Sequence, residues 1–342
     1  MTDAACPVDL APVAPPTVST RRPQAGAWLV IRNPVAGRAR NRRAWADFER
    51  ALRRAGLRFD VCTTTRPGDG ARLGNSALSA GIDRILVAGG DGSVHDVLNG
   101  LMRTRGAAVV ANEPAPTLVP VPLGTGNDWS RSLRLPRDPE RLAALVAAGA
   151  TAPHDVGVIR FPGRDEAPRW FINVAGAGFD AHVISRLPAP TPSRFAYLAG
   201  ALRELGRYQS PRFRIEVEDG RCREGRFLLA FVANGQYCGH RMHVAPPALL
   251  DDGRFDVVTV DDMGVLRALP KLLRLYFGNV LRDPLVQHAT TRCVSIESDP
   301  VTAVEADGQL VGTTPVEIRV ERYAVRTICR PSGAEPKFVT CA

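Results

Sequence analysis

Three glycine-rich segments bring together residue types that handle phosphate groups. They are Asn33-Pro34-Val35-Ala36-Gly37, Gly89-Gly90-Asp91-Gly92-Ser93 and Gly124-Thr125-Gly126-Asn127-Asp128. Glycine lets a backbone approach phosphate oxygens closely, and the N-terminus of a following helix presents free N–H groups to an anion. Asp91 and Asp128 add carboxylates, and Mg²⁺ takes few such ligands together with several waters. One such turn is weak evidence, but the three together favour a nucleotide site.

The two aspartates also have a purely structural interpretation. A carboxylate in a tight turn can cap a helix, and Asp128 stands where it would cap a helix beginning at Trp129. The Walker pattern GxxxxGK[ST] is absent, and the chain has no lysine in these turns. Positive charge for a polyphosphate would therefore come from the arginines at 38, 40, 42 and 43, although a solvated helix face is the plainer interpretation for most of them.

Short apolar runs precede the glycine turns and predict the strands that position them. These runs are 28–31, 85–88 and 118–121, and 57–62 is a further predicted strand. Apolar residues recur with helical spacing in 48–55 and 94–101, and another helix is predicted over 137–148. Alternating strands and helices predict a parallel sheet covered on both faces, with ligands at the carboxyl edge. We expect a Rossmann-like, three-layer α/β nucleotide-binding domain over 27–153.

The pattern changes to β-rich in the second half. The predicted strands are 213–217, 227–232, 255–260, 294–296 and 316–320, with Asp-Gly turn signals between them. We expect a mainly antiparallel β-sandwich domain over 154–330, with helical inserts near 194–208 and 264–277. Residues 1–26 and 331–342 show no periodicity and are predicted to be loose tails.

Composition narrows the class of protein. The chain has 342 residues and a net charge of +9, which favours an anionic partner. No apolar run reaches the roughly 18 residues of a spanning helix, and no secretory signal is recognisable. The seven scattered cysteines predict reduced thiols rather than a disulfide framework or a zinc site. We find no nucleic-acid recognition motif and predict no nucleic-acid partner.

These motifs resemble the diacylglycerol kinase catalytic-domain family, bacterial lipid kinases related to sphingosine and ceramide kinases. The resemblance spans roughly 27–330. Its specific parts are Asn33-Pro34, 89–93 with 97–101, 122–128, 171–173, 233–235, 245–246, 251–256 and 307–308. Gly-Gly-Asp-Gly-Ser alone is less specific, because NAD kinases and phosphofructokinases carry similar strings.

The resemblance implies that ATP and a lipid meet in a cleft between the two domains. The implied ATP-binding residues are Asn33, Pro34, Val35, Ala36, Gly37, Thr64, Gly89, Gly90, Asp91, Gly92, Ser93, Val94, His95, Gly124, Thr125 and Asn127. Asp91 and Asp128 would organise the catalytic Mg²⁺. A structural Mg²⁺ site would use the Asp252 side chain and the carbonyl oxygens of Leu249 and Arg254.

One catalytic position departs from the family pattern. The family's proposed proton acceptor is the Glu of an Asp-Gly-Glu turn, whereas this chain has Asp307-Gly308-Gln309. A glutamine amide cannot accept the hydroxyl proton as a carboxylate would. Either Asp307 or Asp91 serves as base, or the loose transition state needs little base help, or catalysis is weakened. Asp91, Asp128, Asp307 and Gln309 are therefore the catalytic candidates.

The implied function is an ATP-dependent lipid kinase that is cytoplasmic and acts transiently at the membrane face. Its acceptor would be a hydroxyl of diacylglycerol or of a related lipid, such as a sphingoid base, ceramide or phosphatidylglycerol. The alternatives are a catalytically weakened lipid or nucleotide sensor and a soluble-substrate kinase resembling NAD kinase. The sequence leaves the acceptor and the oligomeric state open, a homodimer included.

Overall fold

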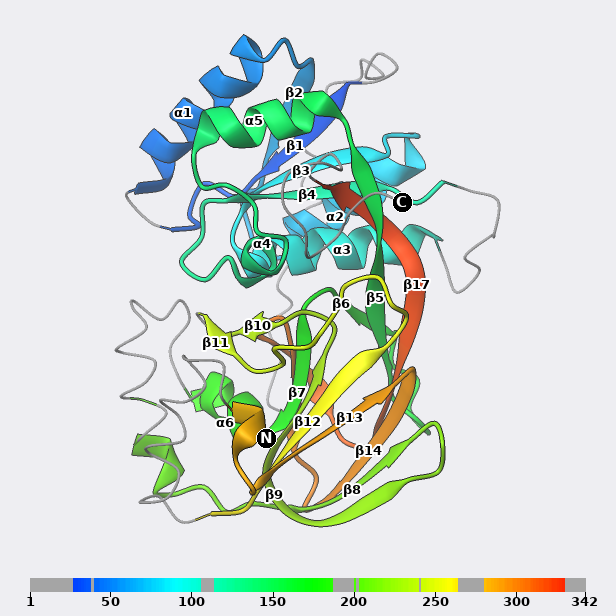
Figure 1. The fold of residues 1–342 in the computed structure, drawn as a ribbon. Helices are drawn as coiled ribbons and strands as arrows, with labels where there is room; N and C mark the ends of the chain where they lie inside the picture. The colour runs from blue at the N-terminus through cyan, green and yellow to red at the C-terminus, as the bar shows by residue number, and fades with distance from the viewer. Residues whose placement is uncertain are drawn as a thin grey trace, which may run out of the picture.

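The chain forms an α/β half and a β-rich half, one above the other in Figure 1. The structure, a computed structural model, describes residues 27–37, 40–105, 114–186, 200, 203–239, 241–263 and 280–329. The predicted tails and the insert near 264–277 lie outside these residues, and of the insert near 194–208 mainly 203–208 is described, beginning with a helical stretch. None of the described helices is both long enough and apolar enough to cross a membrane.

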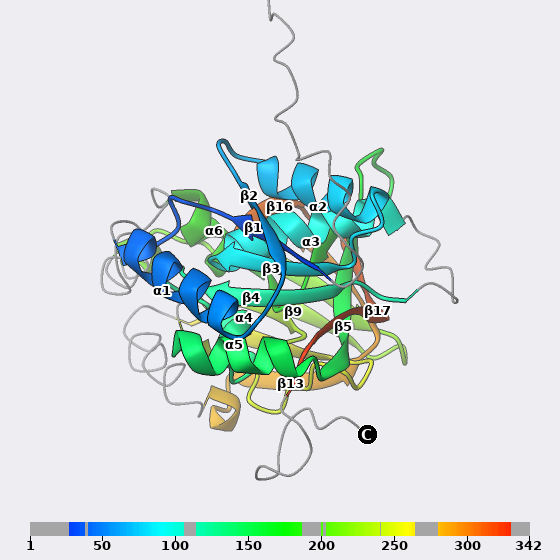
Figure 2. The same ribbon diagram turned by 90° about the horizontal axis from the view of Figure 1, so that it is seen from above.

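Parallel strands form the centre of the N-terminal half. They are β1 (Trp28–Arg32), β2 (Phe59–Thr63), β3 (Arg84–Gly89) and β4 (Thr117–Pro122), in the order β2-β1-β3-β4. Helices α1 (Arg40–Arg54) and α5 (Pro139–Ala148) cover one face, and α2 (Asp69–Ser79) and α3 (Asp91–Arg105) cover the other, as Figure 2 shows. Trp28 and Val30 pack on the face that α1 and α5 cover, whereas Leu29 and Ile31 pack on the face that α2 and α3 cover. The predicted three-layer α/β arrangement is confirmed.

Helix α2 was not anticipated, because glycines interrupt its apolar stripe. Those glycines allow close packing on α3. A Cβ on Gly74 would lie 2.6 Å from the carbonyl oxygen of Val97, and one on Gly100 of α3 would lie 2.0 Å from that of Ala71. The two helices therefore touch through their backbones, and α3 is held firmly at the sheet edge where Asp91 begins it.

The C-terminal half consists of antiparallel strands that enclose a core rich in phenylalanine. Its strands are β5 (Thr151–Arg160), β6 (Arg169–Phe171), β7 (Val174–Gly178), β8 (Arg212–Val217), β9 (Cys222–Ala233), β12 (Phe255–Asp261), β13 (Val286–Thr291), β14 (Cys293–Asp299), β15 (Ala303–Ala306), β16 (Gln309–Thr313) and β17 (Val316–Ile328), with the short hairpin β10 (Tyr237–Cys238) and β11 (Met242–His243). The long strand β9 pairs with β8 through its first part and with β7 and β12 through its last. It thereby joins the two layers of the predicted β-sandwich.

Two long strands connect the halves. β5 and β17 pair along their length, and β17 also meets β4 at Arg326 and Thr117 (Figure 1). The register of β17 shifts between Glu321 and Val325. Residues 322–324 therefore form a bulge in β17 opposite the single residue Asp155 of β5. The domain boundary at 153/154 stays a prediction, and β5 runs through it without interruption.

The cysteines follow the prediction only in part. Cys62, Cys222, Cys238 and Cys293 are free thiols, whereas Cys329 is disulfide-bonded. The expectation of reduced thiols is therefore wrong at Cys329, where no paired spacing in the sequence marks a bond.

Candidate active site

A cavity of about 460 Å³ lies between the two halves and collects most of the predicted site. Its walls come from the carboxyl edge of the parallel sheet and from β7, the 305–309 turn and the β10–β11 hairpin. The predicted residues that line it are Asn33, Ala36, Gly37, Gly90, Asp91, Gly92, Ser93, Val94, Gly124, Thr125, Asp128, Asp307 and Gln309. The structure therefore brings together residues that the sequence spreads from 33 to 309.

Several predicted ATP-binding residues stand just outside the cavity wall. These are Pro34, Val35, Thr64, Gly89, His95 and Asn127. Val35 is exposed, and the N–H of Thr64 donates to the carbonyl oxygen of Arg32. The side chains of the arginines at 38, 40 and 42 lie outside the described residues.

The glycine turns pack so tightly that side chains would not fit. A Cβ on Gly37, where φ is +67°, would lie 2.0 Å from the carbonyl oxygen of Leu123. A Cβ on Gly124 would lie 2.4 Å from the Cα of Gly90. Asn127 closes the third turn, because its Nδ2 donates to the carbonyl of Gly124 at 2.7 Å and its Oδ1 accepts the N–H of Gly124 at 3.0 Å. The turns form a rigid backbone wall suited to close approach by phosphate oxygens.

Asp91 is the first residue of α3, and its carboxylate caps the neighbouring short helix α4 (Asp128–Ser132). Oδ1 of Asp91 accepts the N–H groups of Asp128 at 2.8 Å and Trp129 at 3.3 Å. The cap that the sequence suggested for Asp128 is therefore supplied by Asp91. Asp128 itself accepts the N–H of Arg241 at 2.9 Å and lies 3.9 Å from the Nε of Arg131. Both carboxylates are thus fixed at the edge of the sheet.

The electrostatics of this pair suit a divalent cation. Burial, followed by the charge of Asp128, raises the pKa of Asp91 to about 7. A bound cation would relieve this repulsion, and two carboxylates completed by waters are a common donor set for Mg²⁺. Within the described part of the chain, no group of three or more His, Cys, Asp or Glu residues could hold a metal. The pair therefore fits Mg²⁺ better than a metal that needs a full protein cage.

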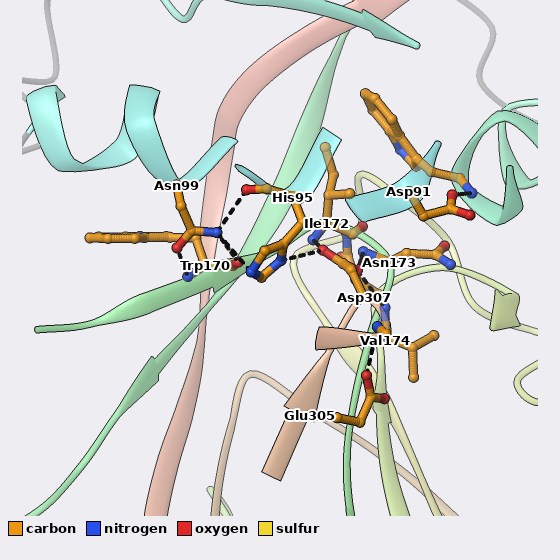
Figure 3. Close-up of polar contacts among 12 residues, drawn as sticks. Asp91, His95, Asn99, Trp170, Ile172, Asn173, Val174, Glu305 and Asp307 are labelled. Atoms are coloured by element: carbon orange, nitrogen blue, oxygen red, sulfur yellow. Dashed lines mark hydrogen bonds and ion pairs between the residues drawn. The ribbon is translucent and has the colours of Figure 1, made fainter. Parts of the chain in front are cut away.

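Asp307 is an anchor rather than an open carboxylate (Figure 3). Its Oδ1 accepts the N–H groups of Asn173 at 2.9 Å and Val174 at 3.3 Å, and its Oδ2 accepts that of Ile172 at 3.0 Å. Nδ1 of His95 lies 3.2 Å from the same Oδ2. Both oxygens of Asp307 are therefore occupied by these donors, so the geometry disfavours Asp307 as a proton acceptor.

His95 joins the two halves instead of facing the cavity. Its Nε2 lies 3.3 Å from Nδ2 of Asn99, whose side chain also bonds the backbone N–H and carbonyl of Trp170 at 3.0 and 2.8 Å. Figure 3 shows this chain of contacts from α3 to β6 and to Asp307. The ATP contact implied for His95 is not supported by its position, because both ring nitrogens point into this buried network.

Gln309 lies beside the start of α3. Its Nε2 is 3.0 Å from the position that a Cβ on Gly92 would occupy, and it lines the cavity. The side chain therefore reaches the neighbourhood of Asp91, as expected for the family's Glu position. An amide at this point can orient a ligand by hydrogen bonding, but it cannot take up a proton.

Sequence reasoning missed Asp180 and Glu305. Both line the cavity and both are buried, Asp180 at the start of α6 (Phe179–Arg186) and Glu305 in β15. The same cavity is also lined by apolar side chains, namely Val174, Ile184, Phe231 and Met242. A signal was available in each case, since an acidic residue inside an apolar run such as Val304-Glu305-Ala306 is unusual for a plain core strand.

The residues proposed for a structural Mg²⁺ site lie away from the cavity. Asp252 follows the exposed Leu249, and its Oδ1 accepts the N–H of Arg254 at 2.9 Å. The neighbouring Gly253 donates its N–H to Asp155 at 2.6 Å. This loop therefore adjoins the β17 bulge, and the metal site itself stays a prediction.

The chain is similar to known proteins over nearly its whole described length. Residues 27–159 match the family described as diacylglycerol kinase catalytic domain, and residues 173–329 match the YegS C-terminal NAD kinase beta sandwich-like domain. A Chromohalobacter salexigens protein named "Probable lipid kinase YegS-like" is 32% identical, covering 82% of this chain and 86% of that protein. A Bacillus subtilis protein named diacylglycerol kinase is 28% identical, covering 84% and 91%.

Solved structures show the same architecture. A structure described as a diacylglycerol kinase from Bacillus anthracis str. Sterne has a TM-score of 0.65 at 23% identity, covering 90% of this chain and 98% of that chain. Another from the same organism has a TM-score of 0.72 at 25% identity, with the same coverage. Together with the matched domains, these relatives identify the chain as a member of the diacylglycerol kinase catalytic-domain family of lipid kinases.

Proposed function

We propose that this chain is an ATP-dependent lipid kinase that transfers the γ-phosphoryl group of ATP to a hydroxyl of diacylglycerol or a related lipid. The observation that carries the proposal is the cavity in which Asp91 and Asp128 converge. The glycine turns and apolar residues of the β-rich half line this same cavity. A phosphate donor and a lipid acceptor could thus meet at the two aspartates.

The nucleotide would bind along the glycine turns. Gly90, Gly124 and Gly126 line the cavity with backbone, and α3 begins at Asp91 with its N–H groups directed to the same edge. Asn33 steadies this wall, since its Nδ2 donates to Oγ of Ser93 at 2.9 Å. In this arrangement the backbone, rather than a lysine, provides most of the phosphate contacts.

Asp91 and Asp128 would hold Mg²⁺, which neutralises charge on the transferring phosphoryl group when bound. The protein's own contribution is to orient the two carboxylates and to exclude water with the apolar wall. Asp307 is committed to backbone N–H groups and Gln309 cannot accept a proton. With Asp91 and Asp128 given to the metal, positioning and charge rather than a free carboxylate base would carry the transfer.

The acceptor would approach from the β-rich half. Val174, Ile184, Phe231 and Met242 offer an apolar surface for the part of the lipid next to its hydroxyl. The net charge of +9 would favour an anionic membrane, by about 1 kcal/mol for each arginine held near its surface.

The test is transfer of label from γ-labelled ATP, with Mg²⁺, to vesicles containing diacylglycerol, a sphingoid base, ceramide or phosphatidylglycerol. We expect at least one labelled lipid, and none from the Asp128→Asn variant. NAD without lipid serves as the soluble acceptor. If no lipid is labelled by folded protein, the proposal fails; label in NAD instead would indicate a soluble-substrate kinase.

A further inference from the structure

Three arginines form a cluster beside Asp128 at the edge of the cavity. Arg131 lies in α4, Arg137 in the segment that follows α4, and Arg241 in the turn between β10 and β11. Helix α4 packs against β10, as Figure 1 shows. Other residues of this hairpin and of α4 line the cavity. The fold therefore brings the arginine cluster, Arg131, Arg137 and Arg241, to the mouth of the cavity.

Arg131 is held in place, but one of its nitrogens lacks an acceptor. Its guanidinium lies 5.7 Å from the centre of the Tyr237 ring, and that ring stacks on His243 with 4.4 Å between centres. The Nε of Arg131 is buried and has no hydrogen-bond partner in the described part of the chain, since Oδ1 of Asp128 is 3.9 Å away. A buried donor without a partner costs free energy, so this nitrogen is suited to an incoming acceptor.

The arginine cluster carries more positive than negative charge. Burial, followed by the charge of Arg241, lowers the pKa of Arg131, and the charge of Arg137 adds to this. Arg137 and Arg241 are exposed, and neither forms an ion pair with a described residue. Asp128 sets one negative charge against three positive ones, and the proposed function already gives that carboxylate to Mg²⁺. An anion bound between the arginines would relieve their mutual repulsion.

The surroundings indicate which anion fits. Guanidinium groups match phosphate oxygens, but the phosphates of the nucleotide already have the glycine turns and Mg²⁺. The arginine cluster instead combines two exposed arginines with the ring of Tyr237. Amphipathic rings and long cationic side chains are typical of protein surfaces that meet lipid headgroups.

We propose that Arg131, Arg137 and Arg241 bind the phosphate group of a phospholipid and thereby seat the mouth of the cavity on an anionic bilayer. This inference deepens the proposed lipid kinase function and rests on it for the role of Asp128. The phosphate belongs either to the acceptor lipid itself or to a lipid beside it. In both cases the headgroup lies next to the carboxylate that would hold Mg²⁺.

The first experiment measures binding without turnover, by sedimentation with phosphatidylcholine vesicles that contain or lack phosphatidylglycerol. Arg241→Gln should bind the anionic vesicles about fivefold more weakly than the wild type, and the double variant Arg137→Gln, Arg241→Gln about twenty-five-fold more weakly. Both side chains are exposed, so we expect the variants to fold. The matched control is Arg221→Gln, which removes one positive charge from the exposed turn between β8 and β9 and should bind as the wild type does.

Transfer of label from γ-labelled ATP then shows whose phosphate occupies the site. The vesicles contain both diacylglycerol and phosphatidylglycerol. Label in phosphatidylglycerol would assign the phosphate to the acceptor, and label in diacylglycerol alone would assign it to a neighbouring lipid. The KM for ATP should be unchanged in Arg241→Gln.

The outcomes separate this inference from the proposed function. If Arg221→Gln loses as much vesicle binding as Arg241→Gln, net charge alone drives binding and the inference is wrong. A raised KM for ATP in Arg241→Gln would also overturn it, because the arginine cluster would then serve the nucleotide. If no lipid is labelled while the difference in binding holds, the proposed function fails and the phosphate site stands.

Discussion

The cavity contains two carboxyl pairs that the fold treats in opposite ways. Asp91 and Asp128 receive backbone N–H groups from α4 and from Arg241, so their orientation is set before any ligand binds. Asp180 and Glu305 instead face each other over Gly176, and Glu305 also accepts the N–H of Gly308. The backbone therefore fixes the first pair, whereas the second pair is set by the contact between its own two carboxyl groups.

The largest expected effect tests the preorganised pair. Asp91→Asn should lower phosphoryl transfer by about a thousandfold with every acceptor, because one charge at the phosphate is lost and an amide faces the N–H of Asp128. Transfer rates measured with saturating lipid check this. Asp165→Asn, at an exposed aspartate between β5 and β6, should match the wild type, and a loss below tenfold in Asp91→Asn would remove Asp91 from the reaction.

A second prediction compares the free energies of unfolding of two variants, one at Asp307, which accepts backbone N–H groups, and one at Asp180. Asp307→Asn should lower the free energy of unfolding by about 3 kcal/mol, because three backbone N–H groups and His95 lose a charged acceptor. Urea denaturation of this variant and of Asp180→Asn measures the contrast. The latter should be at least as stable as the wild type, and equal losses in the two would contradict the distinction.

The third prediction is a pH dependence that belongs to the buried carboxyl of Asp180. The pKa of Asp180 rises from 3.8 to about 7 on folding, so the folded chain keeps a proton that the unfolded chain has released. This proton stabilises the folded chain at low pH, and the stabilisation is lost as the pH rises through 7. The free energy of unfolding should fall by about 2 kcal/mol between pH 5 and pH 7. Urea midpoints across this range should show a shallower decline in Asp180→Asn. An identical decline would mean that Asp180 does not titrate there.

The smallest effect is expected at Gln309. Gln309→Glu should change the transfer rate by less than about tenfold, if positioning and charge carry the reaction without a base at this point. The same labelled-ATP assay measures it. A gain of a hundredfold or more from a nearly inactive parent would instead support a weakened sensor. Position 309, rather than Asp91, would then limit the transfer rate.

The N-terminal part of the site could be predicted because its signals are local. Asp91 and Asp128 each follow an apolar strand run and a glycine, and parallel strand ends meet at one edge of a sheet. Helix α2 escaped notice because its glycines, needed for contact with α3, weaken the apolar stripe. Local spacing thus predicted the edge of the sheet more completely than it predicted the helices beside that edge.

The C-terminal part depends on pairings between distant segments, which one sequence does not reveal. Asp307 was recognised as important, but its bonds to the 172–174 backbone arise from the docking of β7 and β15. The same docking brings Glu305 to Asp180 over Gly176. The family resemblance implied an ATP contact for His95, yet its partner Asp307 becomes its neighbour only in the folded protein.

The bulge in β17 has a mechanical consequence for the cavity. Because β5 and β17 run through both halves as paired strands, widening the cavity has to twist a continuous two-stranded ribbon. The ladder is interrupted where Tyr323, with φ of +54°, donates its N–H to Asp155 at 2.9 Å. Asp155 also holds the loop at Gly253, so one buried carboxylate ties the weakest point of the ribbon to the loop that carries Asp252. Torsional stiffness at residues 322–324 thus bears on the width of the cavity between the two halves.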